Sequence, residues 1–270
     1  MPNYDSFYKH LANKTLDWLP MDTEELYKKN FVDHHSELAY HGWIDNHFTY
    51  EFNSHGFRCK EFTGEPSIMF LGCSFTMGMG LPIDLIWPEL LSKRLNLQCV
   101  NLGIAGSSTD TAFRLCHGWL DKINPTTVIF MKPPGTRCEL VTDEVIKNVD
   151  IEDPSTKDFT KLWILDDNNN YFNSEKNTLA MKMLCADKGI RFIAVSHEDL
   201  VHCYSNSLAR DLAHPGVDRH RVFAEILARR EFGAGTENRT RALTLARSQA
   251  TITSYPHFIG ALCWNRTKPA

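Results

Sequence analysis

The chain has 270 residues, of which 43% are hydrophobic and 23% are charged, a composition typical of a soluble globular protein with a core of its own. Its 29 lysines and arginines against 33 aspartates and glutamates give a net charge of −4, which argues against a generally cationic surface for nucleic acid or anionic membranes. No apolar stretch is long enough to cross a bilayer and residues 1–17 lack the apolar segment of a signal peptide, so we expect a cytoplasmic protein.

Residues 1–64 are predicted to form an extension that packs on the main domain. Segments 5–18 and 22–30 have the pattern of helices, the second with a capping-box spacing between Asp22 and Glu25. Residues 48–52 have the pattern of a strand. Aromatic side chains are frequent in this extension, and packing on the main domain is a better explanation for them than a sugar-binding platform.

The spacing of the histidines and cysteines does not favour a metal site or a disulfide framework. The extension contains His34, His35, His41 and His47, whose spacing does not match a zinc site and which have no cysteine cluster beside them. The eight cysteines are scattered, without a Cys-x-x-Cys pair. We therefore expect buried, reduced thiols and no metal.

Residues 65–233 alternate strands with helices, which predicts a parallel sheet covered by helices on both faces. The predicted strands are 67–71, 98–102, 127–131 and 190–196. The predicted helices are 85–95, 109–123, 175–188 and 217–232. Ser174 and Gly189 are the expected start and stop residues of the third helix.

Two segments stand outside this alternation. Residues 138–173 are acidic and rich in asparagine, with 166–170 as a predicted turn, and are expected to form an excursion beside the site. Residues 234–270 lack sustained periodicity, so we place the end of the domain near Gly233 and interpret the rest as a tail that is disordered, packed on the domain, or foreign to it.

Ser74 is the candidate nucleophile. It follows the predicted strand 67–71 directly, after Gly72 and Cys73, and precedes a predicted helix. Open α/β sheets place their sites at the carboxyl ends of parallel strands, where a tight turn can project a serine hydroxyl. A serine at such a position is also a common turn or capping residue, so Ser74 alone does not establish catalysis.

A second run, 210–216, contains the groups that a serine nucleophile needs. Histidine has the pKa suited to a general base, and His214 stands three residues after Asp211. On a tight turn, the Asp211 carboxylate can hold the imidazole with its other nitrogen toward the serine. The alternative is an ordinary surface turn that leads into the helix predicted after Gly216.

Three runs together resemble the sequence blocks of the SGNH/GDSL hydrolase family. The Gly-Asp-Ser block corresponds to 72–74, the Asn-x-Gly-x-x-Gly block to 101–106, and the Asp-x-x-His block to 211–214. The resemblance spans residues 50–232 and implies a three-layer α/β/α, flavodoxin-like fold with a mainly parallel sheet. It implies that Ser74, His214 and Asp211 are catalytic. It also implies that Asn101 and Gly106 lie in the oxyanion and substrate-binding part of the site, Gly106 through its backbone N–H.

The sequence departs from the family pattern at two positions. Cys73 stands where the family has an aspartate before the serine. The third block, Gly-x-Asn-Asp, is absent after the strand 127–131, where the chain reads Lys-Pro-Pro-Gly-Thr-Arg. Thr136, Arg137 or a backbone N–H are candidate replacements for the asparagine as an oxyanion donor. Losing one such donor typically costs on the order of 10²–10³ in rate.

The resemblance implies a serine hydrolase that acts on a small ester or an acylated carbohydrate, without a metal or organic cofactor and without nucleic-acid or membrane partners. One alternative is a non-catalytic domain of the same fold that binds a glycan or serves as an assembly part. A second alternative is a nucleotide-binding, flavodoxin-like protein, because 72–80 is a glycine-bearing loop. A phosphate loop would carry a lysine after its second glycine, whereas Met79 follows Gly78 here.

Overall fold

The computed structural model describes residues 9–141, 146–149, 167–203 and 205–233. Within these residues the centre of the molecule is a four-stranded parallel sheet in the order β4-β3-β5-β8. Its strands are β3 (Ser67–Leu71), β4 (Gln98–Asn101), β5 (Thr127–Lys132) and β8 (Arg191–Ser196). Each lies within one residue of its predicted bounds, and Ile68 sets the register by pairing with Cys99 on one side and Thr127 on the other.

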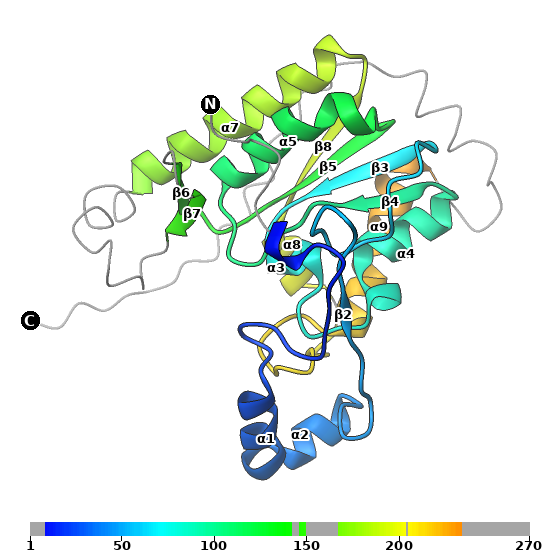
Figure 1. The fold of residues 1–270 in the computed structure, drawn as a ribbon, viewed down its shortest axis with the longest axis vertical. Helices are drawn as coiled ribbons and strands as arrows, with labels where there is room; N and C mark the ends of the chain where they lie inside the picture. The colour runs from blue at the N-terminus through cyan, green and yellow to red at the C-terminus, as the bar shows by residue number, and fades with distance from the viewer. Residues whose placement is uncertain (1–8, 142–145, 150–166, 204, 234–270) are drawn as a thin grey trace, which may run out of the picture.

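Helices cover both faces of the sheet (Figure 1). α4 (Trp87–Leu95) and α9 (Val217–Phe232) lie on one face, and α5 (Thr109–Ile123) and α7 (Asp167–Asp187) lie on the other. The predicted three-layer α/β/α arrangement with a parallel sheet is therefore confirmed.

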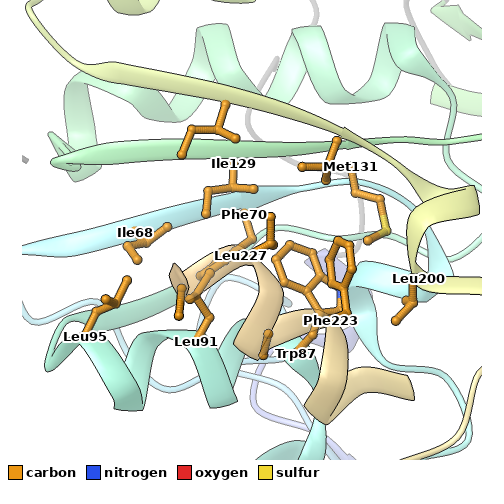
Figure 2. Close-up of a cluster of buried hydrophobic side chains, with 14 of the residues drawn as sticks. Ile68, Phe70, Trp87, Leu91, Leu95, Ile129, Met131, Leu200, Phe223 and Leu227 are labelled. Atoms are coloured by element: carbon orange, nitrogen blue, oxygen red, sulfur yellow. The ribbon is translucent and has the colours of Figure 1, made fainter. Parts of the chain in front are cut away.

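Alternation along the strands divides the core into two layers. Ile68 and Phe70 of β3 face α4 and α9, where Trp87 packs edge-on against both Phe70 and Phe223 (Figure 2). Met69 and the other residues of opposite parity face α5 and α7. Both faces of β3 are fully buried, as expected for a central parallel strand, and each large apolar side chain contributes about 1.5–3 kcal/mol of burial.

Local sequence signals explain where the core helices begin and end. α5 has a capping box in which the Ser108 hydroxyl accepts from the backbone of Thr111. α9 ends at Gly233, which has a left-handed φ of 60°. The predicted helix 85–95 starts later, at Trp87, because Ile83–Leu85 forms a separate 3-10 turn (η2). The sheet connections also include two short helices, α3 (Ser74–Met77) and α8 (His197–Val201).

The predicted helix 5–18 is wrong over its described part, 9–18. This part contains a 3-10 turn, η1 (Lys9–Leu11), and a short strand, β1 (Thr15–Leu16), which pairs antiparallel with β2 (Tyr50–Glu51). Residues 1–8 lie outside the described part of the chain. The strand predicted at 48–52 is present only as β2.

The second predicted helix of the extension is present but starts at a different cap. α1 spans Glu24–Asp33, and its first turn is capped by Thr23, whose hydroxyl accepts from Leu26 N at 3.1 Å. The capping box between Asp22 and Glu25 is wrong, because the carboxylate of Asp22 is buried against Arg210 instead. α2 (His35–Tyr40) follows directly, a helix that the sequence pattern did not indicate.

The excursion after β5 also differs from expectation. Its first part is an antiparallel hairpin of β6 (Cys138–Val141) and β7 (Ile146–Val149). The turn predicted at 166–170 is wrong from residue 167 onward, because α7 begins at Asp167, and Ser174 is an interior residue whose carbonyl accepts from the Thr178 hydroxyl at 2.7 Å. Residues 142–145, 150–166 and the predicted tail 234–270 lie outside the described part of the chain. Among the described helices, none is both long and apolar enough to cross a membrane.

Candidate active site

Ser74 lies at the start of α3, directly after the carboxyl end of β3. The sheet order β4-β3-β5 makes the space between β3 and β5 the point where successive strands are added on opposite sides, the usual ligand site of such folds. Gly72 permits the tight turn, because a Cβ atom there would lie 2.3 Å from Thr76 Oγ1 and 3.0 Å from the carbonyl oxygen of Met131. The turn therefore requires glycine and places Ser74 at the candidate site.

Asp211 and His214 lie on a compact loop that ends where α9 begins. Asp211 Oδ1 accepts from the backbone N–H groups of Ala213 and His214, each at 3.0 Å. Leu212 adopts a left-handed φ of 55°, which closes the turn between them. Ala209 N also donates to the carbonyl oxygen of His214 at 2.9 Å, so both ends of the loop are joined.

The structure brings Ser74, His214 and Asp211 into hydrogen-bonding contact. His214 Nε2 lies 2.9 Å from Ser74 Oγ, and His214 Nδ1 contacts Asp211 Oδ2. Because a carboxylate oxygen can only accept, Nδ1 carries the proton and the lone pair of Nε2 faces the serine hydroxyl in a neutral imidazole. All three residues are buried. This is the geometry in which an imidazole can take the proton of a serine.

Phe75 lies between two histidine rings beside the nucleophile. Its ring centroid is 5.5 Å from that of His214, in an edge-on arrangement, and 6.0 Å from that of His197. His197 begins α8 at the carboxyl end of β8, and its Nδ1 lies 3.0 Å from the carbonyl oxygen of Lys132. No sequence pattern singled out His197, which reaches the site because the carboxyl ends of β5 and β8 are neighbours.

A second buried histidine supports this region. His220 Nδ1 accepts from the backbone N–H of Trp87 at 3.0 Å, and the Trp87 indole donates to the carbonyl oxygen of Phe75 at 3.1 Å. Burial lowers the pKa of His220 to about 3, so its imidazole is neutral and suited to accept. Cys73 is also buried, and burial raises the pKa of its thiol, so it is a poor rival nucleophile to Ser74.

Asn101 and Gly106 occupy the loop after β4. The Asn101 side chain is engaged on both sides, since Nδ2 donates to Thr76 O at 2.8 Å and Oδ1 accepts from Gly103 N at 2.9 Å. Its amide thus joins this loop to α3. Gly106 has a left-handed φ of 72° and is half-buried. Among the described residues, the N–H groups of Gly106 and Ser74 have no partner within the protein.

The two candidate replacements for the missing asparagine lie in the loop between β5 and β6. Thr136 is exposed, whereas Arg137 is half-buried. Burial raises the pKa of the Cys73 thiol, and the positive charge of Arg137 acts in the opposite direction.

The glycine-bearing loop that suggested a nucleotide site is filled by protein atoms. A Cβ atom on Gly78 would lie 2.1 Å from Ile86 Cγ2, and one on Gly80 would lie 2.8 Å from Ala209 Cβ. These glycines therefore allow close packing of the loop on its neighbours and leave no cradle for a phosphate. Within the described residues, no group of three or more histidine, cysteine or acidic side chains is arranged to hold a metal ion.

Two buried arginines, which the sequence did not indicate as site residues, contact the segments next to Ser74 and Asp211. Arg58 donates to the carbonyl oxygens of Gly78 and Leu81, each at 2.5 Å, in the segment that follows α3. Arg210, next to Asp211, pairs with Asp22 of the extension. A charged residue beside a candidate catalytic residue was the only signal that could have indicated this pair.

Comparison with known proteins gives matches among solved structures only. No family model and no curated protein matches the chain. The structure of TesA matches with 13% identity and a TM-score of 0.43, over 60% of this chain and 95% of that one. A putative lipolytic protein of the G-D-S-L family from Desulfitobacterium hafniense has 14% identity and a TM-score of 0.33, over 60% and 98%. An acetylxylan esterase from Geobacillus stearothermophilus has 15% identity and a TM-score of 0.33, over 61% and 93%.

Proposed function

We propose that this protein is a serine ester hydrolase of the SGNH type. The observation that carries the proposal is the buried chain of contacts from Asp211 through His214 to Ser74, with 2.9 Å between His214 Nε2 and Ser74 Oγ. These three residues come from two loops that lie 140 positions apart in sequence. A histidine that merely caps a helix has no reason to face a serine at the carboxyl end of the central strand.

The roles of the three residues follow from their protonation. Ser74 Oγ attacks the carbonyl carbon of the ester while His214 Nε2 takes its proton. The tetrahedral intermediate then expels the alcohol, which receives that proton from His214, and leaves an acyl group on Ser74. Water repeats the sequence, giving its proton to His214 and releasing the carboxylic acid. Asp211 holds Nδ1 protonated throughout and stabilises the imidazolium.

The oxyanion of the intermediate requires donors near Ser74. We assign this role to the backbone N–H groups of Ser74 and Gly106, because neither has another partner among the described residues. Asn101 holds the Gly106 loop against α3 through its two backbone contacts, so we assign it a positioning role. Arg137, which is half-buried, and Thr136, which is exposed, remain the side-chain candidates for a third donor.

The substrate class we propose is a small O-acyl ester, with O-acetyl groups of carbohydrates as one group to be screened. Of the aromatic residues of the extension, Tyr40 and Phe31 are exposed, whereas four others are engaged within the protein. Trp18 and Phe48 lie over the Arg210 guanidinium, and Trp43 and Tyr50 are buried. The choice among alcohols therefore has to come from a substrate panel that compares simple acetyl esters with acetylated oligosaccharides.

Labelling with a fluorophosphonate tests the proposal directly. Attack by Ser74 Oγ on phosphorus releases fluoride and leaves a stable phosphonyl-serine, which mass spectrometry of the peptides locates. We expect stoichiometric labelling of the wild type at Ser74, and loss of labelling in Ser74→Ala and His214→Ala. Ser92→Ala is the matched control, because Ser92 is equally buried but lies on α4 without a histidine partner.

Two results would contradict the proposal. Undiminished ester hydrolysis by Ser74→Ala would place the nucleophile elsewhere. Absence of labelling in a wild-type protein with a cooperative unfolding transition would instead favour the non-catalytic domain that binds a glycan or serves in an assembly.

A further inference from the structure

The N-terminal extension contacts the Arg210 guanidinium through two hydrogen-bonding residues and two aromatic rings. Nη2 lies 2.7 Å from Asp22 Oδ2 and donates to the carbonyl oxygen of Asp17 at 3.0 Å, and Nε lies 3.2 Å from both oxygens of Asp22. The rings of Trp18 and Phe48 lie 4.1 and 4.0 Å from its central carbon. The side chains of Arg210 and Asp22 are 2% and 1% exposed, so the pair is removed from water.

Asp22 is connected to the segment after α3 through Tyr50, and to the loop of Asp211 and His214 through Arg210. The hydroxyl of Tyr50 contacts Asp22 Oδ2 and accepts from the backbone N–H of Gly80 at 2.9 Å. Gly80 in turn accepts, through its carbonyl oxygen, from the backbone N–H of Arg210 at 3.0 Å. Asp22 therefore closes a ring of contacts that joins the segment after α3 to the residue before Asp211.

This ring connects to His214 through very few bonds. Arg210 is covalently linked to Asp211, whose carboxylate contacts the imidazole. Ala209 on its other side donates to the carbonyl oxygen of His214. A displacement of Arg210 is consequently transmitted to His214 from both ends of the loop, whereas a catalytic hydrogen bond tolerates only small errors in position.

We propose that Asp22 and Arg210 form a positioning pair, by which the N-terminal extension sets the orientation of His214 toward Ser74. The inference builds on the proposed function and adds to it that the extension is part of the catalytic apparatus. Neither residue touches the reacting atoms. Their contribution is to hold the segment after α3 and the loop of Asp211 and His214 in a fixed relative position. A fork-shaped guanidinium is suited to this because it bonds two oxygens in one plane.

The test compares Asp22→Asn and Arg210→Lys with Glu231→Gln in the full-length protein. Asp22→Asn keeps the volume and removes the charge, and Arg210→Lys keeps the charge and removes the fork. In the control pair, Arg191 donates to the carbonyl oxygen and the carboxylate of Glu231 and lies 5.0 Å from the Phe232 ring. It is chemically similar to the first pair but joins the start of β8 to the end of α9, away from the site.

Two readouts separate positioning from simple stability. The first is hydrolysis of a short-chain ester, for which we expect kcat to fall about 100-fold in Asp22→Asn and Arg210→Lys with KM unchanged, as for a misplacement of about 1 Å. The second is the NMR signal of the His214 Nδ1 proton, which we expect to shift or exchange away in these variants. Glu231→Gln is expected to retain both properties of the wild type.

The outcomes distinguish this inference from the proposed function. Wild-type kcat and an unchanged Nδ1 signal in a folded Asp22→Asn or Arg210→Lys would overturn the positioning pair and leave the proposed function intact. An inactive wild-type protein whose Nδ1 signal still depends on Asp22 would overturn the proposed function alone. Equal losses in Glu231→Gln would show that only general stability was changed, and would also overturn the inference. If Asp22→Asn does not fold, Arg210→Lys decides, because its charge remains paired.

Discussion

Replacing Asp211 with asparagine is expected to invert the protonation of the imidazole while leaving the loop in place. Asp211 Oδ1 accepts from two backbone N–H groups at 3.0 Å, and Oδ2 accepts from His214 Nδ1. An asparagine keeps the first two bonds only if its oxygen takes the place of Oδ1. Its NH₂ group then faces His214 and requires an acceptor at Nδ1.

The proton of a neutral imidazole would therefore move to Nε2, which faces Ser74 Oγ at 2.9 Å and can no longer accept the serine proton. In the Ser-His-Asp template the same substitution lowers kcat about 10⁴-fold, and we expect a loss of that order here. The two retained backbone bonds should leave the unfolding midpoint close to that of the wild type.

Steady-state hydrolysis of a short-chain ester at neutral pH measures this loss, and the rate of fluorophosphonate labelling should fall in parallel. The control is the urea unfolding transition of the same preparation. A folded Asp211→Asn protein that loses less than about tenfold in kcat would refute the reasoning, because it would mean that Asp211 does not set the tautomer of His214.

Three further changes test the surroundings of the site. His220→Asn keeps an acceptor for Trp87 but removes an imidazole whose pKa falls from 6.5 to about 3 on folding. The free energy of unfolding of the wild type should therefore decline by about 1.4 kcal/mol per pH unit below pH 6.5, and that of the variant should decline less steeply. Urea unfolding at pH 7.5 and pH 5 measures the difference. Gly72→Ala should cost about 1–3 kcal/mol in thermal unfolding and lower the labelling rate, because the new Cβ would clash with Thr76. Thr127→Val should raise stability by about 1 kcal/mol without changing activity, because this buried hydroxyl has no partner among the described residues.

The parts of the fold that the sequence predicted are those in which local signals and burial agree. Thr109–Ile123 carries its own capping residues and an apolar face, and its predicted and observed bounds coincide. The strand Ser67–Leu71 is buried on both faces, so it could be predicted from its apolar run without deciding which of its residues face the core. The contact between Asp211 and His214 was predictable, because a separation of three positions on one tight turn limits their mutual distance.

The parts that the sequence did not predict depend on partners far along the chain. The side chain of Asp22 is suited to cap a helix, but Thr23 caps α1 and the Asp22 carboxylate pairs with Arg210, 188 residues away. Asn101 similarly belongs to a predicted binding pattern, and only the position of α3 shows that its amide is bonded to Thr76 of that helix. A pattern of hydrophobicity carries no information about which residues far apart in sequence will be in contact.

The missing third-block asparagine bears on rate more than on whether Ser74 is activated. In the proposed mechanism, activation of Ser74 needs only His214, which contacts Ser74, and Asp211, which contacts His214. Oxyanion donors act on the transition state, so two backbone N–H groups without a side-chain amide would give turnover lower by about 10²–10³ than a complete set. Slow turnover combined with stoichiometric fluorophosphonate labelling would thus indicate an enzyme with a depleted oxyanion site. Full turnover would instead show that another group completes the oxyanion site, for which Thr136, Arg137 and a further backbone N–H are the candidates.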